Sequence, residues 1–417
     1  MTSKEKLTRA LAHKQPDGVP MDFGSTAVTG MHVTCVAALR DYYGLEKRPV
    51  KICEPYQMLG MMEDDLADAL GVDTAGIIPR NTLFGFPIGN WKEWKAPWGQ
   101  NLLVPRDFNV MQQGSDIYIF PEGDTGVEPS GRMPGGGYFF DTIVRQPPIN
   151  EEHLDYRDNI EEFGPISETD LAHFKQSVEQ ASRTNRGVVA NFGGMGFGDI
   201  ALVPAPFLKH PKGIRDITEW YISTVMRREY VRAIFEKQLE YALENLPKIH
   251  AAIGNAVDVV FLCGTDFGTQ TGTFCSGQTF DELWLPFYKQ INAWIHAHTT
   301  WKTFKHTCGA IEPFMERFIQ AGFDIINPVQ CSATGMDPKK LKERYGDRMV
   351  FWGGGANTQK TLPFGTPPQV REEALARCET FAAGGGFVFN AIHNVQAGVP
   401  VENIVAMINA VREFNRT

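Results

Sequence analysis

The amino-acid sequence predicts an α/β protein of the (β/α)8 barrel class. Three observations predict it: short apolar runs alternate with helical patterns, these runs are hydrophobic at successive positions, and polar residues stand where the runs end. Runs that are apolar throughout are typical of parallel strands buried on both faces. The length of 417 residues is ample for such a barrel with an insertion, so we expect residues 1–417 to form a single domain.

Eight segments qualify as barrel strands. Each is short, rich in Val, Ile or Phe, and bounded by Gly, Asn or Pro. In chain order they are residues 19–23, 75–78, 188–193, 257–263, 303–306, 325–329, 350–352 and 386–390. A closed barrel of this class needs eight parallel strands. An open doubly wound sheet is the alternative, but the glycine-rich run after the third strand lacks the spacing of a dinucleotide-binding loop.

Helical periodicity fills the intervals between the later strands. Apolar side chains recur at helical spacing in residues 280–298, 311–321, 338–345, 367–382 and 401–414. Several of these segments have Pro in the first turn, where the missing N–H leaves no hydrogen bond unmade. Alternating strands and helices bring the carboxyl ends of the strands together at one mouth of a barrel, which is where such enzymes carry their active sites.

Residues 84–146 depart from this pattern. The segment is rich in Trp, Tyr, Phe, Gly and Pro and has no helical periodicity, whereas residues 116–120 alternate in polarity. Such alternation indicates a β-ribbon. We expect this ribbon to be an insertion that covers part of the barrel mouth, and not an independent domain.

Composition excludes several classes of protein. The formal net charge of −9 argues against a nucleic acid as the main ligand, and no apolar run approaches the ~18 residues of a membrane-spanning helix. The seven cysteines are odd in number and too few for a disulfide framework. The first residues lack the apolar core of a signal peptide, so we expect a cytoplasmic enzyme with reduced thiols.

Residues that bind metals gather at the predicted strand ends. His306 and Cys308 are one residue apart at the end of a strand, and they point the same way if the strand continues. His393 follows the last strand and Cys331 follows another, and either can be a third ligand. Imidazole and thiolate with an open position are typical of catalytic zinc. The simpler alternatives are a His393 bonded to a backbone carbonyl and a Cys331 packed as a small buried residue.

Polar residues near other strand ends complete the predicted site. Asp266 lies beyond the strand of residues 257–263 and is a candidate catalytic residue together with His306, with helix capping as the structural alternative. Four amide side chains near strand ends are candidate substrate-binding residues, because they can form hydrogen bonds with a substrate. They are Asn191, Gln270, Asn327 and Gln330.

These motifs resemble the uroporphyrinogen decarboxylase superfamily, and particularly its corrinoid-dependent methyltransferase branch. The resemblance spans nearly the whole chain through residues 16–23, 306–309, 326–330, 335–338, 351–355, 361–367, 384–389 and 393–396. It implies a (β/α)8 barrel and, in the methyltransferases, a zinc ion held by a His-x-Cys…Cys pattern. His306 and Cys308 match the first two ligands, whereas His393 stands in place of the third cysteine, so the third ligand is open between His393 and Cys331.

The resemblance also implies a reaction. The decarboxylases carry an arginine-rich substrate motif that residues 24–30 lack, and a substrate with many carboxylates needs such cations. We therefore expect a methyltransferase that takes a methyl group from a small donor and passes it to the Co(I) corrinoid of a partner protein. The best candidate donor is an aryl methyl ether, whose oxygen Zn²⁺ would bind as a Lewis acid.

Two features of the sequence bear on this expectation. The aromatic residues of 84–146 suit a lid over an aromatic ring, and the chain has no Asp-x-His-x-x-Gly corrinoid-binding motif, so a separate corrinoid protein is expected. Alternatives within the family are transfer from a methylcorrinoid to a thiol or folate, and decarboxylation of the uroporphyrinogen type. A zinc hydrolase and a catalytically silent binding barrel are the alternatives outside it.

Overall fold

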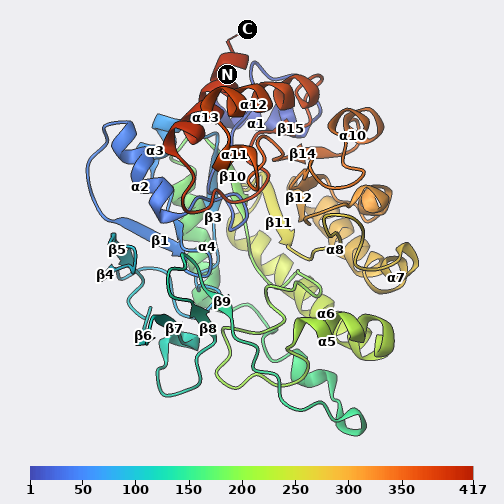
Figure 1. Ribbon diagram of the computed structural model, residues 1–417. Coiled ribbons are helices and arrows are strands. Elements are labelled where there is room, and N and C mark those ends of the chain that lie inside the picture. The colour runs from blue at the N-terminus through green and yellow to red at the C-terminus, as the bar shows by residue number, and fades with distance from the viewer. Residues whose placement is uncertain (417) are drawn as a thin grey trace.

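The computed structural model describes residues 1–416, and its centre is a sheet of seven strands that all run parallel (Figure 1). The strand order is β15-β14-β13-β12-β11-β10-β3. The bounds are β3 (Thr74–Ile77), β10 (Gly187–Ala190), β11 (Val259–Cys263), β12 (Lys302–His306), β13 (Ile325–Asn327), β14 (Val350–Trp352) and β15 (Phe387–Val388). Parallel strands that follow one another in chain order are the arrangement of a (β/α)8 barrel.

Residues 19–23 occupy the eighth position of the barrel. Met21 forms a parallel bridge with Phe389, and Phe389 N donates to Pro20 O at 2.8 Å. On the other side Asp73 N donates to Met21 O at 2.8 Å, so the segment joins the last strand to β3. Pro20 keeps this member irregular, because proline has no N–H to donate to a sheet. The predicted barrel is confirmed, with seven regular strands and one irregular member.

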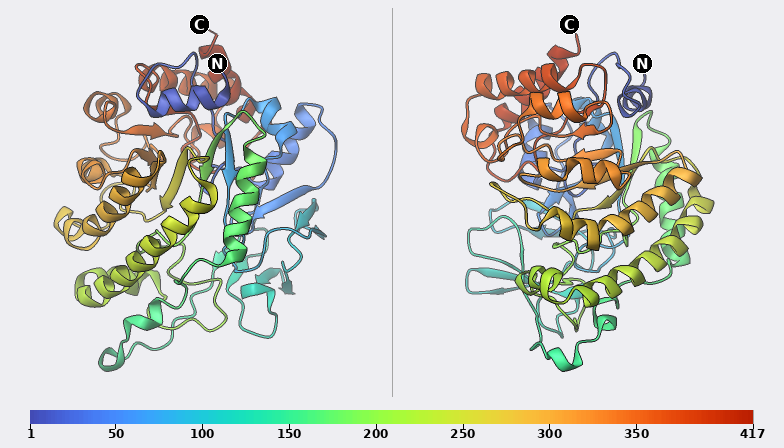
Figure 2. Two further views of the ribbon diagram at one scale, coloured as in Figure 1. Left: turned by 180° about the vertical axis from the view of Figure 1, so that it is seen from behind. Right: turned by 90° about the vertical axis from the view of Figure 1, so that its right-hand side faces the viewer.

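The barrel interior is filled by apolar side chains. The inward residues of neighbouring strands form one buried cluster, which contains Val189, Val259, Phe304, Ile325, Val350, Trp352 and Val388. Leu7 and Leu11 of helix α1 (Ser3–Leu11) belong to the same cluster. Figure 2 shows α1 at the end of the molecule where both termini lie. Because α1 closes the amino end of the barrel, the open mouth lies at the carboxyl ends of the strands.

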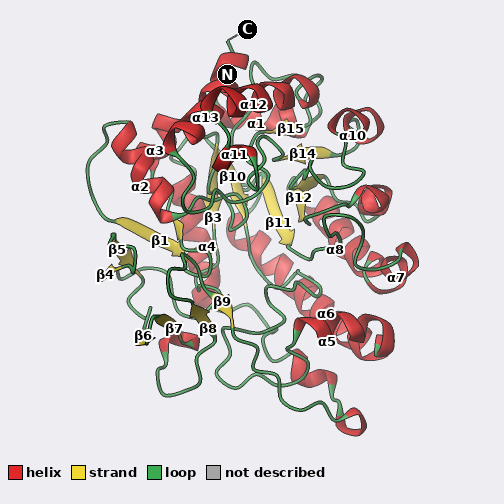
Figure 3. Ribbon diagram, viewed as in Figure 1, coloured by secondary structure: helices red, strands yellow, loops and turns green. Residues whose placement is uncertain are grey.

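Helices form the outer layer around the sheet (Figure 3). After α1 they are α2 (Val33–Tyr42), α3 (Asp64–Leu70), α4 (Glu168–Ala181), α5 (Ile217–Met226), α6 (Arg228–Ile253), α7 (Gly277–Leu283), α8 (Leu285–His298), α9 (Met315–Gln320), α10 (Pro338–Tyr345), α11 (Thr361–Phe364), α12 (Pro367–Phe381) and α13 (Val401–Phe414). Within residues 1–416, none of these helices has the length and hydrophobicity needed to cross a membrane.

Two predicted helices are interrupted where a proline stands. Residues 280–298 do not form one helix but belong to α7 and α8, and Pro286 lies in the first turn of α8. Residues 311–321 begin as a 3-10 turn, Glu312–Phe314, which contains Pro313, and continue as α9. Proline lacks the N–H that a helix interior requires and is tolerated in a first turn, so each proline starts a new helix.

Residues 84–146 contribute to two small sheets. The first has the order β2-β1-β5-β4 and consists of β1 (Val50–Glu54), β2 (Leu59–Gly60), β4 (Lys92–Lys95) and β5 (Asn101–Val104). The second is antiparallel and consists of β6 (Val110–Gln113), β7 (Asp116–Ile119), β8 (Gly131–Met133) and β9 (Asp141–Thr142). The predicted ribbon at residues 116–120 corresponds to β7. In Figure 1 the second sheet lies on the side of the barrel toward which the arrowhead of β11 points.

Candidate metal centre

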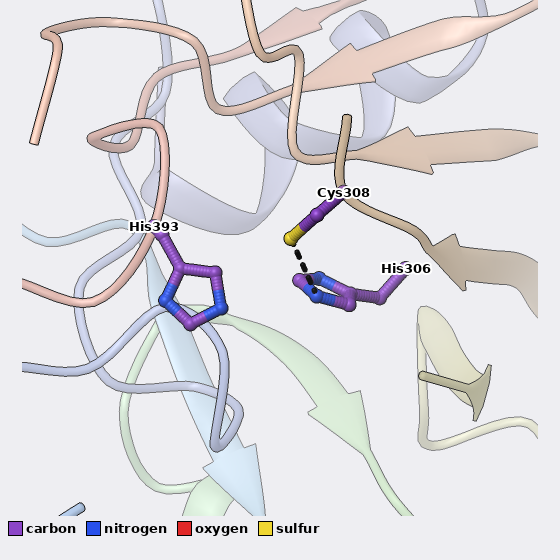
Figure 4. A group of neighbouring side chains, drawn as sticks. All are labelled: His306, Cys308 and His393. Carbon is purple, nitrogen blue, oxygen red and sulfur yellow. Dashed lines mark hydrogen bonds between the residues drawn. The ribbon is translucent and has the colours of Figure 1, made fainter. Parts of the chain in front are cut away.

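Three of the predicted ligands come together at the barrel mouth. His306 is the last residue of β12, Cys308 stands in the loop that follows, and His393 lies in the loop after β15. One possible ligand atom from each residue lies within 4.8 Å of the other two. Figure 4 shows the three side chains grouped together, with Cys308 Sγ 3.5 Å from His306 Nε2. The barrel brings them together because the carboxyl ends of its strands meet at one mouth.

The distance between His306 and Cys308 suits a tetrahedral metal ion. Zinc binds an imidazole nitrogen at about 2.0 Å and a thiolate sulfur at about 2.3 Å. Two such ligands at the tetrahedral angle lie about 3.5 Å apart, and Nε2 and Sγ are separated by 3.5 Å. Two imidazoles and one thiol therefore fit a zinc ion that keeps a fourth position for water or substrate.

Asn327 determines which nitrogen of His306 faces the site. Its Nδ2 donates to the backbone oxygen of Trp352 at 2.9 Å, which turns Oδ1 toward His306. Oδ1 lies 2.6 Å from His306 Nδ1, and because an amide oxygen only accepts, Nδ1 carries the proton. The neutral ring then presents the lone pair of Nε2 to Cys308. Asn327 is fully buried with both amide atoms bonded inside the protein, so it orients His306 in place of the predicted contact with substrate.

Asp266 lies beside the candidate metal ligands and binds the loop of Cys308. Its Oδ1 accepts from Cys308 N at 2.7 Å. Phe267 N donates to Thr307 Oγ1 at 2.8 Å, so the loops after β11 and β12 are joined at two points. Burial raises the pKa of the Asp266 carboxyl, while the hydrogen bond from Cys308 N and the charge of Lys305 oppose the shift. The Asp266 carboxyl group therefore lies next to the candidate ligand Cys308.

Burial also sets the protonation of the ligands. Loss of solvent lowers the pKa of both His306 and His393 to about 4, so their rings are neutral at pH 7 and able to bind metal. Burial raises the pKa of the Cys308 thiol well above its ordinary value, and the nearby Asp266 carboxylate adds to the shift. Metal binding requires the thiolate. Metal uptake should therefore release a proton from Cys308.

Cys331 lies apart from the three ligands. Within the part of the chain that the structure describes, it is not a member of the group that shares the ligand distances. Its thiol has a pKa raised by burial to about 11, and the charges that act on it include Arg377 and Glu373 of α12. Of the two candidates for the third ligand, the geometry favours His393.

The other predicted amide residues occupy different positions around the mouth. Gln330 is buried, and its Oε1 accepts from Gly309 N at 2.8 Å, so it supports the turn that follows Cys308. Asn191 Oδ1 accepts from Gly193 N at 2.9 Å, within its own loop. Gln270 is exposed. Gln270 is thus the most exposed of these three residues, whereas Asn191 is half-buried.

The family model for uroporphyrinogen decarboxylase (URO-D) matches residues 146–414, which is more than half of the chain. This protein belongs to the uroporphyrinogen decarboxylase family. The resemblance seen in its motifs is therefore confirmed at the level of the family, and the matched range contains every residue of the candidate metal centre. The match begins at residue 146, where the aromatic segment ends.

Similar proteins agree with this assignment. Uroporphyrinogen decarboxylase from Pseudoalteromonas translucida is 36% identical over 89 residues, which are 20% of this chain and 24% of that protein. The protein of that name from Psychromonas ingrahamii is 34% identical over 89 residues, with the same shares. The chain spans about a quarter of the length of these curated relatives. A methyltransferase from Methanosarcina mazei resembles this family member over 99% of both chains, with a TM-score of 0.56 and 13% identity, which shows the shared fold.

One residue next to the candidate metal centre was not predicted from the sequence. Lys305 directly precedes His306 in β12 and is fully buried. The sequence does contain a signal for it, because a lysine is almost never fully buried unless it has partners. A lysine inside a short strand that is predicted to be covered on both faces therefore indicates buried hydrogen-bond partners.

Proposed function

We propose that this protein is a zinc-dependent methyltransferase that passes a methyl group from a small donor to the Co(I) corrinoid of a partner protein. Our first candidate for the donor is an aryl methyl ether. The observation that carries the proposal is the grouping of His306, Cys308 and His393 at the mouth, since two imidazoles and a thiol are zinc ligands. Membership of an enzyme family and a fold shared with a methyltransferase support the same reaction class.

The residues of the candidate metal centre would have different roles in this reaction. His306, Cys308 and His393 would hold the metal, and Asn327 keeps Nε2 of His306 free of its proton. Bound zinc supplies Lewis acidity, which lowers the free energy of an oxygen leaving group that must otherwise carry a full negative charge. Asp266, fastened to Cys308 N, would orient a polar group of the donor beside the ligands.

We infer that residues 84–146 cover part of the mouth within a single domain of residues 1–417. Their second sheet lies on the side toward which β11 points (Figure 1). Tyr138 of this segment contacts His32 at the N-terminus of α2, where His32 Nε2 lies 3.0 Å from Tyr138 O. The rings of Trp98 and Tyr138 lie 5.2 Å apart. Aromatic side chains of this segment would offer flat faces for packing against a planar donor ring.

The proposal is tested with zinc-loaded protein, chemically reduced cobalamin and a panel of aryl methyl ethers. We expect the absorbance of methylcob(III)alamin to grow while mass spectrometry detects the matching phenol. Cys308→Ala should abolish both signals, whereas Cys331→Ala, which removes a thiol outside the ligand group, should retain them. Two results would overturn the proposed reaction in a protein that binds about one zinc per chain. One is that no donor of the panel methylates cobalamin, and the other is that the protein cleaves a donor in the absence of cobalamin.

A further inference from the structure

Lys305 places a charged group on the outer side of the barrel, directly behind the metal centre. Phe304 belongs to the cluster inside the barrel, and successive side chains of a strand point to opposite faces, so Lys305 points toward the helices. Its Nζ lies 5.1 Å from the ring centre of Phe267 and 5.9 Å from that of Phe318. An ammonium group that is 0% exposed among aromatic rings is unfavourable unless its N–H groups find acceptors.

Two backbone oxygens accept hydrogen bonds from Lys305. Nζ donates to Thr265 O at 2.5 Å and to His306 O at 2.6 Å. Thr265 directly precedes Asp266 in the loop after β11, and His306 is a proposed ligand at the end of β12. The ammonium group therefore links the two segments from the side that faces away from the mouth.

The same two segments are linked by two further hydrogen bonds. Asp266 Oδ1 accepts from Cys308 N at 2.7 Å, and Phe267 N donates to Thr307 Oγ1 at 2.8 Å. Together with Lys305, these bonds hold residues 265–267 against residues 305–308. The position of the Asp266 carboxyl relative to the two ligands of the second segment depends on this connection.

We propose that Lys305 is a positioning residue for the metal centre: its buried ammonium group fastens the segment of Asp266 to the segment of His306 and Cys308. The hydrogen bonds of Lys305 that join the two segments are formed by the chain alone. Their consequence, tighter metal binding with a defined geometry, rests on the proposed function. Residues that orient ligands from outside the coordination sphere typically change metal affinity by about 10- to 100-fold.

The test compares Lys305→Met with Lys342→Met in the full chain. Methionine keeps the length and apolar stem of lysine but donates no hydrogen bond. Lys342 is the matched control, because its Nζ also donates to a backbone oxygen, Gly385 O at 2.8 Å, and Gly385 lies at the amino end of the barrel next to Lys14. In metal-free protein, the amides of Phe267 and Cys308 should exchange hydrogen about tenfold faster in Lys305→Met, and at the wild-type rate in Lys342→Met.

Metal binding gives the second measurement. The zinc dissociation constant, from competition with a chromogenic chelator, should rise about 10- to 100-fold in Lys305→Met, and the visible bands of the cobalt-substituted protein should shift. Lys305→Gln keeps two N–H donors, should restore part of the affinity, and replaces the methionine variant if that variant does not fold. Unchanged exchange in the Lys305 variants would overturn the fastening, and faster exchange with unchanged zinc and cobalt behaviour would overturn its effect on the metal. A wild-type chain that binds no zinc would refute the proposed function, while the exchange rates would still decide the role of Lys305.

Discussion

Replacement of Asn327 tests whether the orientation of His306 controls metal binding. Asn327→Ala removes the acceptor 2.6 Å from His306 Nδ1 and the donor 2.9 Å from Trp352 O. The freed imidazole can rotate or carry its proton on Nε2, which would then not bind metal. Loss of such an orienting partner typically weakens metal affinity about 10- to 100-fold, which corresponds to about 1.4–2.8 kcal/mol of binding free energy.

The stability of the metal-free protein should fall in the same variant. Trp352 O is left without its donor and His306 Nδ1 without its acceptor, and each buried polar group without a partner costs about 1–3 kcal/mol of unfolding free energy. Asn292→Ala is a matched control for this loss. Asn292 is also buried, and its Nδ2 donates to Ala321 O at 2.6 Å, but it does not contact a proposed ligand.

The assay separates orientation from stability. Zinc dissociation constants come from competition with a chromogenic chelator, and unfolding free energies come from urea titration. We expect Asn327→Ala to lose both affinity and stability, Asn292→Ala to lose stability alone, and Asn327→Asp to bind zinc more tightly than Asn327→Ala, because a carboxylate still accepts from Nδ1. Equal zinc affinity in the wild type, Asn327→Ala and Asn292→Ala would refute the reasoning.

Three further predictions concern the third ligand, the Cys308 thiol and the buried His32. His393→Ala should lower bound zinc well below one per chain by elemental analysis whereas Cys331→Ala should not, and the reverse result would make Cys331 the third ligand. Addition of zinc to metal-free protein at pH 7 should release about one proton, because the pKa of the Cys308 thiol is raised by burial and only the thiolate binds. An indicator dye in weak buffer measures the released proton. No release, or equal release from Cys308→Ala, would contradict Cys308 as the source of the proton. Burial lowers the pKa of His32 to about 4 from its ordinary 6.5. Between these two pH values the imidazole is protonated in the unfolded chain but neutral in the folded chain. The contribution of neutral His32 to the free energy of unfolding is therefore complete above pH 6.5 and is lost as the pH falls toward 4. Between pH 7 and pH 5, urea titration should therefore show the wild type losing about 2 kcal/mol relative to His32→Gln, and parallel losses in both proteins would argue against a neutral buried His32.

Much of the barrel can be predicted because strand and helix patterns are local. The strands predicted at residues 303–306 and 350–352 lie within β12 and β14, whereas the strand predicted at 386–390 contains only two residues of regular strand, β15. Beyond β15, Phe389 still forms a parallel bridge with Met21 of the irregular eighth member, so the apolar run is longer than the regular strand. The breaks at Pro286 and Pro313 depend on one residue each and are lost when periodicity is averaged over a longer segment.

The sequence by itself determined the barrel class, the resemblance to the family, and the pairing of His306 with Cys308, because two side chains one residue apart at a strand end stay neighbours in any barrel. Only the tertiary structure brought His393, and not Cys331, to within ligand distance. It also decided that Asn327 holds His306 and that Lys305 lies behind the centre. These contacts join strands and loops that are distant in the chain, and their geometry depends on how the whole barrel packs, which no local pattern records.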